Sequence, residues 1–169
     1  MKFTDIFDTA PSEIKEKFIQ LYAMRERPDY HPEESAGRHI EIVVERAIQF
    51  GDKDLIMAAF YHDIHKHDTM KINEKTGWPT SPGHDKWSHN TIRDNVLVQS
   101  HISEFGADID TVRVICGEHM RYHQLDKMKE SKQLEMKSLF CFNKLRAFGI
   151  MDNMLISDEE CIQQIKDLK

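Results

Sequence analysis

Apolar residues recur every three or four positions along most of this chain, which is the spacing of amphipathic helices. Glycine and proline residues mark where the helices end. Together with the apolar pattern they predict helices over about residues 12–27, 34–50, 54–65, 88–105, 109–122 and 136–148, and a last helix after Ser157. No segment sustains the alternation of a β-strand. We therefore expect an all-α fold, a single-domain helical bundle of about seven helices that spans residues 1–169.

The helix expected over about residues 54–65 should lie at the centre of the bundle, because its run from Leu55 to Tyr61 is apolar nearly all round. Periodicity then disappears from His67 to about Lys86, where glycine and proline cluster. A loop of this length inside a compact domain is usually functional or mobile.

Charge and composition narrow the function classes. The net charge of −6 argues against a broad nucleic-acid surface, which needs a basic excess. A small phosphate substrate remains open, because a bound metal ion can supply local positive charge. The three cysteines form no CxxC pair and no apolar run is long enough to cross a membrane, so we expect a soluble, cytoplasmic protein. The oligomeric state stays open, with a homodimer as one option.

Histidine is unusually frequent, and eight of the ten histidines lie between His62 and His123. Histidine is the commonest metal ligand in proteins. His62 and Asp63 end the most buried of the expected helices, where two polar side chains without a partner would be costly. A metal ion bound by both would offset that cost.

Two more side chains complete a candidate metal site. His39 shares a helix face with Val43 and should point toward the central helix. Asp152 follows a helix that is punctuated by Gly149. Two imidazoles and two carboxylates suit a divalent ion such as Mn²⁺, Mg²⁺, Ni²⁺, Fe²⁺ or Zn²⁺. Four protein ligands on an octahedral ion leave positions for water and substrate.

The order His39, His62-Asp63, Asp152 resembles that of the HD superfamily of metal-dependent phosphohydrolases. The stretch from His62 to Lys66 is similar to the family's His-Asp-hydrophobic-Gly-Lys motif, with His65 in place of the glycine.

Further features extend the resemblance over about residues 34–156, with one helix added at each end. His89 stands where the family often has a histidine that opens the helix after the loop, and His119 where many members have another. Residues 137–152 are similar to the helix before the last aspartate in the HD domain of bacterial tRNA nucleotidyltransferases. The chain leaves no room for a nucleotidyltransferase head, so we expect only the phosphohydrolase side of that family.

The resemblance implies hydrolysis of a phosphate ester on a nucleotide or an RNA end, of the phosphodiesterase or phosphatase type. It implies that Asp63 ligates the metal and orients a water molecule, and that Lys66 contacts a phosphate. His89 and His119 would bind phosphate oxygens or protonate the leaving group. Alternatively, they would hold a second metal ion.

Structural explanations compete with these roles. Without metal, the four candidate ligands would form a buried ion-pair network. Lys66 would be a solvated lysine at a helix end, and His89 and His119 would be exposed residues at helix ends. The remaining histidines are expected to be solvent-facing or at a pocket rim (His65, His67), a lid contact (His84), or on the surface (His31, His101, His123).

Three other functions remain open. The first is a nucleotidase or deoxynucleotide triphosphohydrolase. The second is a di-iron oxygenase, which would need His89 and His119 as iron ligands. The third is a nucleotide-binding module without catalysis, which the complete ligand set disfavours.

Overall fold

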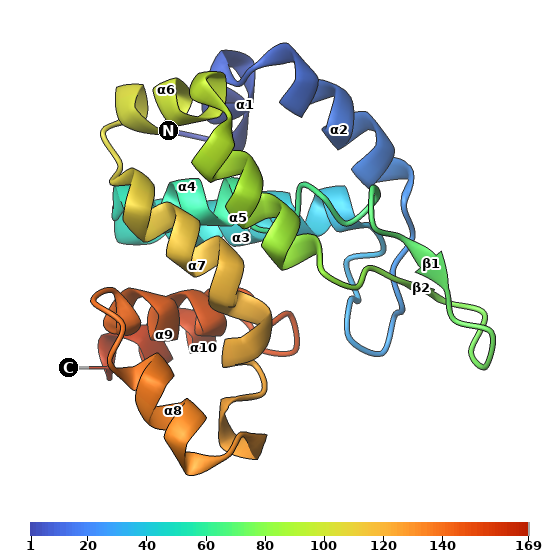
Figure 1. The fold of residues 1–169 in the computed structure, drawn as a ribbon. Coiled ribbons are helices and arrows are strands. Elements are labelled where there is room, and N and C mark those ends of the chain that lie inside the picture. Colours follow the sequence, from blue (N-terminus) through green and yellow to red (C-terminus); the bar gives the residue numbers. More distant parts are fainter. Residues whose placement is uncertain (169) are drawn as a thin grey trace.

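The computed structural model describes residues 1–168 and confirms the all-α class (Figure 1). In that part of the chain there are ten α-helices, three more than we expected. Their bounds are α1 Phe3–Thr9, α2 Ser12–Ala23, α3 Ala36–Phe50, α4 Lys53–Tyr61, α5 His84–Asp94, α6 Val96–Phe105, α7 Ile109–Tyr122, α8 Glu130–Lys137, α9 Phe142–Met151 and α10 Asp158–Lys166. A single 3₁₀ turn, Leu125–Lys127, follows α7.

The additional helices have local causes. The single helix expected over about residues 88–105 is two helices, because the Asn95 side chain accepts hydrogen bonds from the backbone N–H groups of Leu97 and Val98 and starts α6. The segment before α9 forms the separate helix α8. The short helix α1 was not predicted, and it is held by burial of Phe3 and Ile6 rather than by propensity.

The segment expected as a loop over residues 67–86 contains a small hairpin. Strand β1 (Lys71–Ile72) pairs antiparallel with β2 (Pro79–Thr80), with Lys71 opposite Thr80. The hairpin projects away from the helices (Figure 1). Its second strand leads directly into α5, which begins earlier than we expected.

Helix α4 lies at the centre of the fold, as its composition predicts. Every residue from Leu55 to Tyr61 is buried, and the helix packs against α3 on one side and α7 on another. Gly51 ends α3 in the left-handed conformation, with φ of 69°, and the Asp52 side chain then accepts from the first amides of α4. This tight corner fixes α3 against α4 and so brings their functional residues together.

Two histidines expected near solvent are structural. His101 is buried, with Nδ1 2.7 Å from the Tyr61 hydroxyl and Nε2 3.1 Å from Thr9 Oγ1. His65 is also buried, and its ring contacts Asp68 and Thr91. Both were predicted wrongly, because their burial depends on helices that are distant in sequence. Among residues 1–168, no helix is long and apolar enough to cross a bilayer.

Candidate metal centre

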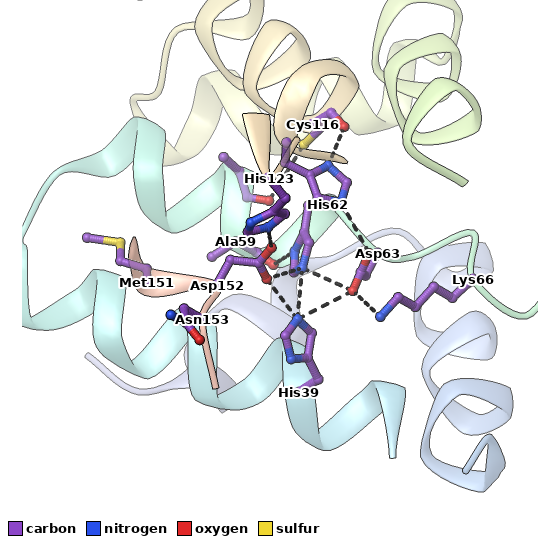
Figure 2. Close-up of polar contacts among 12 residues, drawn as sticks. His39, Ala59, His62, Asp63, Lys66, Cys116, His123, Met151, Asp152 and Asn153 are labelled. Carbon is purple, nitrogen blue, oxygen red and sulfur yellow. Dashed lines mark hydrogen bonds and ion pairs between the residues drawn. The ribbon is translucent and has the colours of Figure 1, made fainter. Parts of the chain in front are cut away.

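Four side chains from three parts of the chain meet at one point beside α4 (Figure 2). His39 comes from α3, His62 and Asp63 from the C-terminal end of α4, and Asp152 from the C-terminal end of α9. All four side chains are buried. The structure therefore brings together the four residues that we expected to hold a metal.

The separations of the ligand atoms match those around one small cation. His39 Nε2 lies 2.9 Å from Asp152 Oδ1, 3.3 Å from His62 Nε2 and 3.4 Å from Asp63 Oδ2. His62 Nε2 lies 3.1 Å from Asp63 Oδ2 and 3.3 Å from Asp152 Oδ1. Bonds of about 2.1 Å to a common ion put neighbouring ligands about 3.0 Å apart in octahedral geometry and about 3.4 Å apart in tetrahedral geometry.

A second group of ligand atoms lies around the other oxygen of Asp63. His84 Nε2 is 2.9 Å from Asp63 Oδ1, and His119 Nε2 is 3.6 Å from the same oxygen. The two imidazole nitrogens are 3.3 Å apart. Asp63 thus spans two adjacent sets of donors, and all three side chains of this second set are buried.

Hydrogen bonds on the far side of each ring fix which nitrogen faces the cluster. Nδ1 of His62 lies 2.8 Å from the Ala59 carbonyl oxygen, and Nδ1 of His119 lies 2.8 Å from that of Cys116. Nδ1 of His84 lies 2.6 Å from another carbonyl oxygen, that of Ser81. A carbonyl can only accept, so each Nδ1 carries a proton, and each ring in its neutral form directs the Nε2 lone pair at the carboxylates.

His39 follows the same rule with a carboxylate as its outer partner. Its Nδ1 lies 2.7 Å from Glu33 Oε1. Histidines that bind metal usually donate their other N–H to a carboxylate or a backbone carbonyl. All four imidazoles have this arrangement.

Lone pairs and carboxylates facing each other at these distances repel unless a positive charge lies between them. Asp63 Oδ1 is buried and has no hydrogen-bond donor among residues 1–168, although His84 Nε2 is only 2.9 Å away. A divalent ion would supply the missing charge, with both atoms as its ligands. The donor set therefore fits a metal at each oxygen of Asp63.

The same excess of negative charge perturbs the titration of the metal-free cluster. Burial opposes protonation of His62, but Asp63 and Asp152 outweigh it and raise its pKa to about 10. His39 is also desolvated, yet hydrogen bonds to Asp152 and Glu33 raise its pKa to about 9. Although burial favours the neutral acids, the nearby His62 keeps the pKa of both aspartates well below the usual range. Without metal, protons occupy the place that a cation would take.

His89 does not join either group of ligands. Its Nε2 lies 3.1 Å from Arg113 Nη1, and its ring packs against Gly117. We selected it as the histidine that opens the helix after the loop, but α5 begins at His84. The same criterion applied to the observed helix start selects His84, which we had expected only as a lid contact.

Two further side chains contact the cluster. Lys66 is buried and lies 2.8 Å from both Asp63 Oδ2 and Glu26 Oε1; burial opposes its charge, but these carboxylates raise its pKa. His123 is exposed, as expected, and its Nε2 lies 2.7 Å from Asp152 Oδ2. The contact of Lys66 with Asp63 is local, three positions along the chain, whereas those of Lys66 with Glu26 and of His123 with Asp152 depend on how distant segments pack.

A cavity of about 700 Å³ opens onto this cluster. The loop before α3, the end of the hairpin and the segment after α9 contribute its other walls. The apolar side chains among its lining residues include Tyr30, Pro79, Pro82, Met154 and Leu155. The size suits a small organic molecule.

Comparison with known proteins finds distant relatives over part of the chain. A Multifunctional CCA protein of Xylella fastidiosa is 25% identical over 121 residues, which cover 69% of this chain and 27% of the relative. Another Multifunctional CCA protein, from Neisseria meningitidis serogroup B, is 26% identical over 145 residues, or 83% of this chain and 32% of the relative. The chain thus spans about a quarter to a third of the length of these relatives. No protein-family model and no solved structure match the chain.

Proposed function

We propose that this chain is a metal-dependent phosphohydrolase that binds two divalent ions side by side and acts on a phosphate ester of a nucleotide or an RNA end. The ligands of the first ion would be His39, His62, Asp63 and Asp152. The ligands of the second would be Asp63, through its other oxygen, with His84 and His119.

One observation carries this proposal. The inward nitrogen of each of four buried histidines lies 2.9 to 3.6 Å from a carboxylate oxygen, while the outward nitrogen is already committed to a fixed acceptor. A buried ion-pair network held by protons alone would not need all four rings to have the same orientation. Two adjacent metals explain the orientation of every ring.

The side chains divide the work of the reaction. When bound, the ions polarise a phosphoryl oxygen and lower the pKa of a bound water. Lys66 is held at the cavity wall by Glu26, where its ammonium can contact a phosphate oxygen as a point charge. His119 donates its Nδ1–H to the Cys116 carbonyl oxygen, so its Nε2 is suited to bind metal rather than to donate a proton.

Charge at the cluster and its immediate partners favours an anionic substrate. Glu26, Glu33, Asp63 and Asp152 contribute four negative charges, and Lys66 contributes one positive charge. Two divalent ions would add four, which leaves an excess of one positive charge at the floor of the cavity. The similarity to the Multifunctional CCA proteins supports a nucleotide or RNA phosphate among the possible anions.

The test is a metal-by-substrate screen on chelator-stripped protein. Mn²⁺, Mg²⁺, Ni²⁺, Fe²⁺ and Zn²⁺ are each combined with 2′,3′-cyclic nucleotides, nucleoside monophosphates and deoxynucleoside triphosphates. We expect at least one pair to restore hydrolysis, and Asp63→Ala to abolish it. The released product separates a phosphodiesterase or phosphatase from a triphosphohydrolase.

The matched control is His89→Ala, which removes an imidazole outside the cluster and should keep activity. Turnover that survives in Asp63→Ala, or that needs no metal in the wild type, would refute the proposal. Tight nucleotide binding without turnover under any metal would instead indicate a binding module.

A further inference from the structure

The loop between α2 and α3 is an ordered structure that lies beside the metal cluster. Its neck is closed by an isolated β-bridge between Arg25 and Ser35, and the Glu26 amide donates to the Glu34 carbonyl at 3.1 Å. Glu34 adopts a positive φ of 75°, which turns the chain sharply before α3. The closed neck brings the segment that contains Glu33 back beside Glu26.

These two glutamates are buried although they carry charge. Their side chains are 9% exposed for Glu26 and 3% exposed for Glu33. One oxygen of each is accounted for, since Lys66 binds Glu26 Oε1, and His39 binds Glu33 Oε1. The second oxygen of each, Oε2, is buried and has no hydrogen-bond partner in the part of the chain that the structure describes. A buried carboxylate oxygen without a donor is costly.

His31 lies between the two carboxylates. Its Nδ1 is 2.9 Å from Glu33 Oε1 and 3.5 Å from Glu26 Oε2. A proton on Nδ1 can satisfy the first contact, but the second is too long for a good hydrogen bond. Both separations lie close to the 3.0 to 3.4 Å, roughly, that neighbouring ligands of one small divalent ion adopt.

We propose that Glu26, His31 and Glu33 form a third divalent-cation site, separate from the two sites at Asp63. Two carboxylates and one imidazole suit a hard or borderline ion such as Mn²⁺. The cation would neutralise the charge of two buried carboxylates, each of which has one oxygen without a donor among residues 1–168. Glu33 would then connect the two centres, since its other contact is the outer nitrogen of His39.

Nearby cations do not already fill this role. The guanidinium of Arg27 is committed to Asp29 at 2.6 Å and lies over the Tyr30 ring. The Lys66 ammonium contacts the opposite oxygen of Glu26 and shares its charge with Asp63.

Both Glu26 and His31 line the cavity, so a cation here would face the same space as the two-metal cluster. It could therefore bind a second anionic group of the substrate. That role rests on the proposed function, whereas occupancy of the site does not.

Metal stoichiometry tests the proposal directly. Chelator-stripped protein is equilibrated with Mn²⁺, freed of unbound metal and analysed by elemental mass spectrometry. We expect three equivalents in the wild type and two in both Glu26→Gln and His31→Asn. Glu26→Gln keeps an oxygen for Lys66 while it removes the charged acceptor, so the fold should be retained.

Glu34→Gln is the matched control, because it neutralises an exposed carboxylate on the same loop and should leave three equivalents. Two equivalents in the wild type, or three in both test variants, would overturn the third site and leave the two-metal proposal standing. Absence of any bound Mn²⁺ would overturn both, so the two failures are distinguishable. Circular dichroism of each variant verifies that it is folded.

Discussion

The guanidinium of Arg46, in the middle of α3, donates to the backbone carbonyl of Met151 at 2.9 Å, one residue before Asp152. The same side chain donates to the carbonyls of Asn153 and Ile156 at 2.8 Å each. Arg46 lies on the same helix as His39. One helix therefore supplies a candidate ligand and also fixes the backbone around a second one.

This relationship predicts a large cost for removing the guanidinium. Arg46→Met should lower the free energy of unfolding by about 2–4 kcal/mol, because three carbonyls at the end of α9 lose a charged, buried donor. Urea denaturation of metal-free protein measures the change.

The control for this prediction is Asp158→Asn, since Asp158 also pairs with Arg46 but is 58% exposed. Water screens the charge of an exposed carboxylate, so the loss should stay below about 1 kcal/mol. Equal losses in the two variants would contradict the idea that the backbone carbonyls are the important partners.

A second prediction concerns pH and the docking of the first helix. Burial lowers the pKa of His101, which is neutral between the Tyr61 hydroxyl and Thr9 Oγ1. The unfolded chain then binds this proton more readily than the folded chain does. Stability should therefore be fully present above the unfolded pKa of about 6.5 and fall as the pH drops below it.

The measurement is a difference between two proteins. The wild type and His101→Gln are unfolded by urea at about pH 7.5 and at about pH 5. We expect the stability advantage of the wild type to shrink by on the order of 1 kcal/mol at the lower pH. Titration of the metal cluster largely cancels in this difference, because His101 lies on α6, in contact with Thr9 of α1, and not at the cluster. A constant advantage across this range would exclude protonation of His101 as the cause.

Much of the fold was predictable from the sequence, and the errors have physical causes. The apolar face of α3 and the run of apolar residues on every side of α4 predict which surfaces are buried, because apolar side chains pack in the core. The split at Asn95 depends on the capping contacts of one side chain, and the early start of α5 follows a hairpin whose strands have two residues each. Hydrophobic periodicity does not detect features this short.

The candidate site was also predictable only in part. His39, His62, Asp63 and Asp152 were recognised from their order in the chain, and the structure brings them together. The selection of His89 rather than His84 followed from a misplaced helix start. The role of Glu33 could not be predicted, because it depends on how the loop before α3 folds back beside His39.

The placement of His84 and His89 gives a third prediction, on the number of metals at Asp63. His84→Ala should lose one equivalent of bound Mn²⁺ and most of the activity, because the second set of ligands would keep only Asp63 and His119. The first set does not include His84, so its ion should remain. His89→Ala removes an imidazole five positions further along the chain and should change neither the metal content nor the activity. If His84→Ala kept its full metal content, the site at Asp63 Oδ1 would not exist.

A fourth prediction concerns the outer partner of His39. Glu33→Gln should weaken metal binding at the first site by about 10- to 100-fold, because a neutral amide polarises the imidazole less than a carboxylate does. Hydrogen bonds to His31 and His39 hold the pKa of Glu33 at about 2, against the opposing effect of burial, so the residue is charged throughout the working pH range.

The variant is to be compared with Glu26→Gln, which should affect the proposed third cation but not the affinity of the first site. Competition with a fluorescent chelator measures the affinity for the tightest-bound ion in each of the two variants. The loss in Glu33→Gln should also be smaller than in His39→Ala, since the ligand itself is retained. If Glu33→Gln left the metal affinity unchanged, His39 would be oriented by its helix alone. The burial of Glu33 would then serve only its contact with His31.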